Sequence, residues 1–113
     1  MSYLLQYATP RSVAGGARVD ERLALNLPGF YGDAHVRVFV EDTSWKRWRR
    51  EPPEPRVRLR VADCENAIAL EFSVSTAELR ENSLFKADTL LGALQRFRDA
   101  LAAEAELAER RGR

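Results

Sequence analysis

The chain of 113 residues contains one cysteine, Cys64, and one histidine, His35. A single cysteine cannot form an intramolecular disulfide, and one cysteine with one histidine cannot complete a tetrahedral zinc site. The sequence also lacks the glycine-rich patterns that bind nucleotide phosphates and the Gly-x-Ser-x-Gly turn of serine hydrolases. It therefore predicts no metal site and no cofactor.

Long hydrophobic runs are absent as well. No apolar stretch approaches the roughly 20 residues of a membrane span, and the amino terminus lacks the basic start and apolar core of a signal peptide. We therefore expect a cytoplasmic protein with no membrane partner. Apolar residues make up 45% of the chain, enough for one ordinary core, so a single domain over residues 1–113 is expected.

Groups suited to catalysis are few. Cys64 and His35 could act as nucleophile and base only if the fold brought them together, and a turn thiol beside an edge histidine is the simpler interpretation. Glu41 and Glu71 share the expected polar sheet face with arginines, so cross-strand salt bridges explain them without acid–base chemistry. We expect a protein that is not an enzyme.

Alternating apolar and polar residues predict strands in four segments: Val19–Leu27, Val36–Val40, Val57–Val61 and Ile68–Val74. Turn residues separate them at 28–33 and 63–66. A weaker segment at residues 2–8, followed by Gly15-Gly16, could add a fifth strand. The pattern is typical of an antiparallel β-meander of four to five strands within residues 1–74.

Helical spacing begins after residue 75. Ser75-Thr76-Ala77-Glu78 resembles a capping box with Ser75 as the cap, and Asn82-Ser83 could interrupt the helix. The apolar stripe then continues through Ala87, Leu90, Leu94, Phe97, Leu101, Ala105 and Ala108. Because a sheet with one apolar face needs a cover, we expect an α+β fold in which the helical region 76–111 packs across that face.

The predicted helix is longer than the predicted sheet. From about Leu84 to Arg111 it would measure roughly 40 Å, whereas strands are typically about 17–20 Å long. Its end, Leu101–Ala108, should overhang the sheet and either pair with a second copy of the chain or lie in solvent. The homodimer and the solvated terminus are left open at this point.

A segment of residues 44–56, called here the Trp/Arg loop, holds both tryptophans. The whole chain has 18 basic and 17 acidic residues, but from Thr43 to Arg60 seven basic residues face two acidic ones. Tryptophan and arginine frequently anchor protein interfaces, and together they also stack on bases and pair with phosphates. The candidate partner-binding residues are Trp45, Lys46, Arg47, Trp48, Arg49, Arg50, Arg56, Arg58 and Arg60.

Three interpretations of the Trp/Arg loop are open. It could dock on an acidic protein surface, or it could bind nucleic acid together with the arginine-rich strand 56–60. Alternatively, the tryptophans fold inward to close the core and the arginines cover them. We expect a small non-catalytic interaction module, a subunit, adaptor or inhibitor of a larger assembly, with nucleic-acid binding as the alternative.

The turn at residues 28–33 is a second binding candidate, because Phe30 and Tyr31 lie between glycines. The two rings could equally plug the open end of the sheet. In a consecutive antiparallel meander this turn and the Trp/Arg loop lie at opposite ends of the sheet. The two segments would then not form one site.

Overall fold

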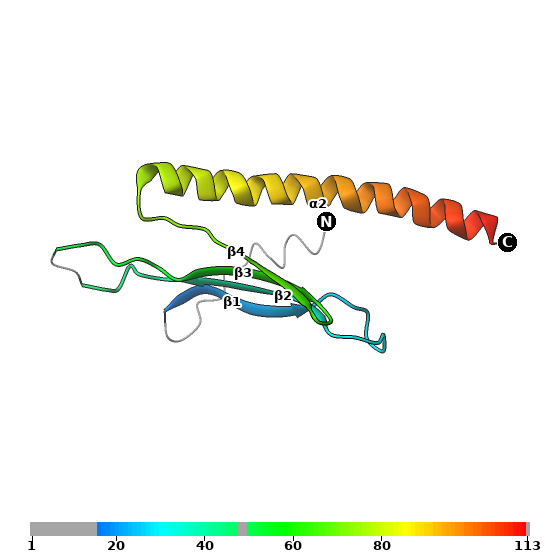
Figure 1. Ribbon diagram of the computed structural model, residues 1–113, viewed down its shortest axis with the longest axis horizontal. Helices are drawn as coiled ribbons and strands as arrows, with labels where there is room; N and C mark the ends of the chain where they lie inside the picture. Colours follow the sequence, from blue (N-terminus) through cyan, green and yellow to red (C-terminus); the bar gives the residue numbers. More distant parts are fainter. Residues whose placement is uncertain (1–15, 48–49, 113) are drawn as a thin grey trace.

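A computed structural model describes residues 16–47 and 50–112 of the chain and shows a four-stranded antiparallel sheet followed by one long helix (Figure 1). The strands follow one another in the order β1-β2-β3-β4, which confirms the predicted meander and the α+β fold. The expected additional strand at residues 2–8 lies outside the described residues. The elements are β1 (Ala17–Ala24), β2 (Ala34–Glu41), β3 (Val57–Asp63), β4 (Asn66–Leu70) and α2 (Ala77–Arg111).

The register of the sheet collects the apolar positions on one face. Leu23 of β1 pairs with Val36 of β2, and Val36 pairs with Val61 of β3. The next row toward the other end joins Val38 to Leu59. Because alternate side chains of a strand point to opposite faces, the charged residues between these positions share the other face. We call the two sides the apolar face and the polar face.

Two strands end earlier than the alternation predicts. β1 ends at Ala24, because the Asn26 side chain donates hydrogen bonds to the carbonyls of Tyr31 and Gly32 and turns the chain toward β2. β4 ends at Leu70, after which the chain leaves the sheet and leads to the start of α2 (Figure 1). The expectation that residues up to Leu27 and Val74 belong to strands is therefore wrong.

Helix α2 begins at Ala77 and is continuous to Arg111. Its N-cap is Thr76, whose Oγ1 accepts a hydrogen bond from the Leu79 amide at 3.1 Å, so the expected cap at Ser75 is wrong. The expected interruption at Asn82-Ser83 is also absent. Ser83 is buried and its hydroxyl donates to the Ser73 carbonyl at 2.7 Å, outside the helix, so it does not compete for the helical backbone.

The helix runs across the apolar face and approaches it through its N-terminal turns (Figure 1). There the two layers enclose an apolar crevice of about 330 Å³, lined by Val40, Val57, Phe72, Val74, Arg80, Ser83, Leu84 and Ala87. The Lys86 ammonium donates to the Glu71 carbonyl at 2.7 Å and ties the helix to the connection from β4. The C-terminal half of α2 extends beyond the end of the sheet, as the predicted lengths require.

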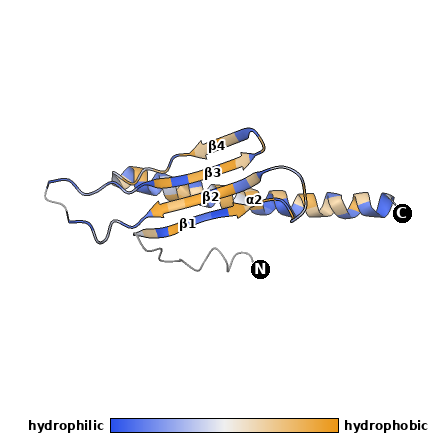
Figure 2. Cartoon of the chain, turned by 90° about the horizontal axis from the view of Figure 1, so that it is seen from below, coloured by the Kyte–Doolittle hydropathy of each residue, from blue (hydrophilic) through white to orange (hydrophobic). Residues whose placement is uncertain are grey.

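Few apolar side chains are buried in the described part of the chain. Among the described residues the buried apolar side chains are Ala17, Ala34 and Ala62, and no large side chain is fully buried. Figure 2 shows apolar positions on the strands and along the helix. Many of the large apolar residues remain exposed, including most of those on α2.

Candidate functional site

The Trp/Arg loop connects β2 to β3 and projects from one end of the sheet, while residues 25–33 project from the other (Figure 1). The two candidate segments are therefore separate, as predicted. Phe30 and Tyr31 are 71% and 102% exposed, so neither ring plugs the sheet. Trp48 and Arg49, both predicted to bind a partner, lie outside the described residues.

Trp45 lies on the surface at the base of the loop and is 63% exposed. Its indole lies against the backbone of Gly16, where an added Cβ would come within 2.5 Å of Nε1. Lys46 Nζ lies 5.9 Å from the centre of the indole, within cation–π distance. The Trp45 ring is thus supported on one side and accessible to a partner, which contradicts its placement in a core.

Glu41, at the end of β2, organises the base of the loop. Its carboxylate lies 2.8 Å from Lys46 Nζ and accepts the Arg56 amide at 3.0 Å, and its side chain is only 11% exposed. The hydrogen bond from Lys46, followed by that from the Arg56 backbone, holds the pKa of Glu41 below its ordinary value. The charge of Lys46 is therefore neutralised within the protein by Glu41, whereas Arg47 and Arg50 are exposed.

The neighbouring Asp42 completes this turn. It accepts the Ser44 amide at 2.9 Å, and hydrogen bonds from the Ser44 side chain and backbone lower the pKa of Asp42. Asp42 also lies 3.3 Å from Arg18 of β1. The carboxylates of Glu41 and Asp42 both stay charged at neutral pH and hold the first residues of the Trp/Arg loop in place through hydrogen bonds.

Arg56 links the loop to the polar face of the sheet. Its guanidinium lies 5.4 Å from the centre of the Phe39 ring, and its side chain is exposed. Phe39 pairs with Arg58 in the register, and both project from the polar face. The loop and the polar face consequently form one continuous surface.

Three arginines from three strands form a row on the polar face. Arg22 pairs directly with Arg37, and Arg37 pairs directly with Arg60. Like charges placed opposite each other in a sheet are unfavourable. Arg37 lies 3.4 Å from Asp20, and Arg58 has no ion pair among the described residues. The surface therefore carries more positive than negative charge.

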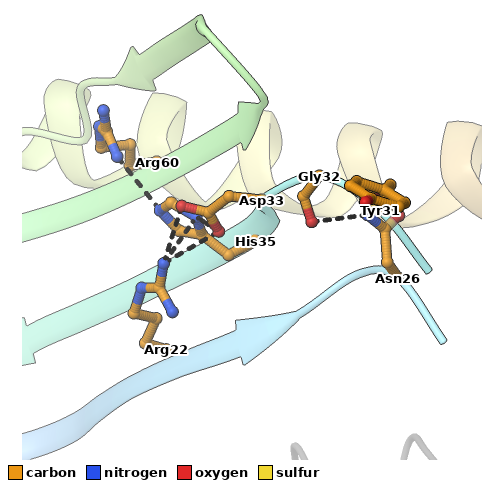
Figure 3. A network of polar contacts seen from close by, with 7 residues as sticks. All are labelled: Arg22, Asn26, Tyr31, Gly32, Asp33, His35 and Arg60. Carbon is orange, nitrogen blue, oxygen red and sulfur yellow. Dashed lines mark hydrogen bonds and ion pairs between the residues drawn. The ribbon is translucent and has the colours of Figure 1, made fainter. Parts of the chain in front are cut away.

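His35, on the middle strand β2, lies between Arg22 and Arg60 and is 8% exposed (Figure 3). Arg60 Nη1 lies 3.2 Å from His35 Nε2, and because arginine only donates, Nε2 is the acceptor. Nδ1 lies 3.2 Å from Asp33 Oδ1 and 3.1 Å from Arg22 Nη2. Arg22 donates to the same carboxylate at 3.1 Å. The hydrogen bond from His35 and the charge of Arg22 lower the pKa of Asp33.

The arrangement of His35 also bears on Cys64, the candidate nucleophile. Cys64 lies in the β3–β4 turn with a positive φ of 54°, and its amide donates to the Asp33 carbonyl at 2.9 Å. Both ring nitrogens of His35 face Asp33 and Arg60, and neither is directed at the thiol. The described residues therefore do not form a cysteine–histidine pair.

Arg22 and Arg37 were not among the residues predicted to bind a partner. Sequence alternation places each on the polar parity of its strand, but only the register shows that they join Arg60. Within residues 16–47 and 50–112 no three metal-ligating side chains gather, and no helix there is long and apolar enough to cross a membrane.

Comparison of the chain with protein-family models, with curated protein sequences and with solved structures gives no match.

Proposed function

We propose that this protein is a non-catalytic interaction module that binds an acidic protein surface through the Trp/Arg loop and the adjoining arginines of the polar face. The observation that carries this proposal is the row of Arg22, Arg37 and Arg60, with Arg58 beside it. An acidic partner would relieve the repulsion within the row and add to the few carboxylates, Asp20 and Asp33, that contact it. Such a module would serve as a subunit, adaptor or inhibitor of a larger assembly.

Trp45 supplies the apolar part of this surface. An exposed tryptophan next to arginines is typical of the anchors of protein interfaces. Its support by Gly16 limits the conformational entropy that binding would cost. The loop thus offers a prepared apolar anchor at the edge of a positively charged sheet.

Nucleic acid is the weaker candidate partner. Lys46 and Arg56 both lie within ion-pair distance of Glu41, so fewer cations of the loop are available for a phosphate track than the sequence suggests. The exposed free thiol of Cys64 suits a reducing compartment, and we propose that the module acts in the cytoplasm.

The proposal can be tested by following tryptophan emission during titration with an oligoglutamate peptide and, separately, with an oligothymidine of equal length. We expect the peptide to bind, and Arg58→Ala to weaken that binding roughly threefold to fivefold, equivalent to less than about 1 kcal/mol. Arg96→Ala, which removes the same charge from α2, is the matched control and should bind like the wild type.

Two results would count against the acidic-surface proposal. Tighter binding of the oligothymidine with a steep log-linear salt dependence would favour nucleic acid instead. Failure of both probes to bind, or equal losses in Arg58→Ala and Arg96→Ala, would show that the polar face is not a specific contact surface.

A further inference from the structure

The apolar stripe of α2 continues past the region where the helix meets the sheet. Ser83 and Ala87 face the crevice, and Leu94, Phe97 and Leu101 follow on the same side of the helix at three- and four-residue steps. Yet these three side chains are 62%, 65% and 54% exposed. The apolar side of α2, which amphipathic spacing predicts to be buried, is therefore exposed to solvent at these positions.

The apolar face of the sheet is open as well. On the apolar face, Val61 and Ile68 pair across β3 and β4 and are 37% and 60% exposed. Among the described residues no Cα of α2 comes within 8 Å of a strand Cα. The helix and the sheet thus do not pack closely against each other. In the described part of the molecule only small apolar side chains are buried.

An open apolar stripe of this size signals a contact surface. Soluble monomers rarely expose contiguous apolar patches beyond a few hundred Å². Five side chains form this patch, and with their exposed fractions they present roughly 600 Å² per chain, which is close to the ~800 Å² per partner of a standard stable interface. The members are Leu84, Leu91, Leu94, Phe97 and Leu101.

We infer that the surface that covers this stripe is a second copy of the chain. The lengths of the two layers support this occupant: the 35 residues of α2 span about 52 Å, whereas the eight residues of β2 span about 27 Å. The helix is long enough for two sheets. A helix that serves one sheet alone would leave its second half without a counterpart.

The arrangement that satisfies both copies is antiparallel. Leu94 lies at the middle of α2, and a two-fold axis near it places the C-terminal half of each helix beside the N-terminal half and sheet of the other. The small side chains of Ala105 and Ala108 continue the stripe and permit close approach to the partner. This contact uses the apolar side of the molecule, so it is independent of the polar face and of the proposed function.

Light scattering over a range of concentrations tests the inference directly. We expect the wild type to have twice the chain mass of 12.8 kDa, and Leu94→Asp/Phe97→Asp to be monomeric. Phe85→Asp is the matched control: Phe85 is 70% exposed on the same helix but lies about 200° around it from Ser83, and this variant should stay dimeric. A monomeric wild type, or equal dissociation in both variants, would overturn the inference.

A second measurement tests the orientation and needs no substitution in the stripe. Spin labels on Glu106→Cys/Cys64→Ser should lie about 35–40 Å apart in the antiparallel dimer, because each label is 12 residues from the axis at 1.5 Å per residue. A separation below about 20 Å would mean parallel helices and would overturn the proposed arrangement. If the double aspartate variant loses its helical circular dichroism, the wild-type mass and this distance decide the question.

Discussion

Arg22, Arg37 and Arg60 belong to three different strands, yet each is the direct cross-strand neighbour of the next. At the scale of single residues, short polar contacts offset their repulsion: Arg22 donates to Asp33, Arg37 lies 3.4 Å from Asp20, and the Arg60 guanidinium contacts the His35 ring. The compensation is incomplete, because Arg60 has no carboxylate partner among the described residues. An arginine row of this kind can be tolerated by the monomer while still gaining from an anionic partner.

Gly16 is the residue that fixes Trp45 in place, and its substitution gives a sharp prediction. Gly16 has a φ of +85°, and a methyl group there would collide with the indole. We expect Gly16→Ala to lower the free energy of unfolding in urea by about 1–2 kcal/mol. In a Trp48→Phe background, it should also shift the emission of Trp45 to longer wavelength as the ring moves into water.

Gly29→Ala is the control for the backbone contribution. Gly29 has a similar φ of +91°, but a methyl group there would meet nothing within 4 Å. This variant should lose about 1 kcal/mol of stability and leave the Trp45 emission unchanged. An identical emission in both variants would show that Trp45 does not rest on Gly16.

The surroundings of individual residues were the least predictable feature from the sequence. The composition of the Trp/Arg loop located a candidate surface, but it left the tryptophans undecided between exposed and buried. The outcome for Trp45 depends on Gly16, which precedes β1 and has no recognisable link to the loop in the sequence. The engagement of Lys46 by Glu41 likewise depends on a turn whose geometry local composition does not specify.

At the scale of elements, alternation and helical spacing predicted the four described strands and the helix, because a periodic pattern reflects which side of an element is dry. Element ends were predicted less well. The alternation of apolar and polar residues continues in the sequence to Leu27, but β1 ends at Ala24, where the hydrogen bonds of Asn26 turn the chain. The serine at position 83 resembled a break in the helix, although its hydroxyl finds a carbonyl acceptor in the preceding connection.

That hydrogen bond of Ser83 joins the helix to the segment leading from β4 and can be removed by one substitution. Ser83→Ala leaves the part-buried Ser73 carbonyl without this donor, and we expect the free energy of unfolding to fall by about 1 kcal/mol. Urea unfolding followed by circular dichroism measures the change. Asn82→Ala, at the exposed neighbouring position, should not lower stability, because alanine has the higher helix propensity. A comparable loss there would show that the effect of Ser83→Ala does not come from its hydrogen bond.

At the scale of the whole molecule, the helix and the sheet have unequal lengths and do not enclose a large core. Counting residues in the sequence predicted the overhang, since rise per residue is nearly constant. The sequence did not predict that Val61 and Ile68 of the sheet and Phe97 of α2 all remain exposed. The separation of two layers depends on how all facing side chains pack, and periodicity carries no information about it.

Self-association through the open layers makes the stability of the fold depend on protein concentration. A tenfold rise in concentration favours a folded dimer over two unfolded chains by about 1.4 kcal/mol, which should raise the thermal midpoint by roughly 3–6 °C. We expect this dependence in the wild type and in Phe85→Asp, and not in Leu94→Asp/Phe97→Asp. A wild-type midpoint that stays constant over a hundredfold range would mean that each chain folds alone, and the stripe on α2 would then have to be stable in contact with water.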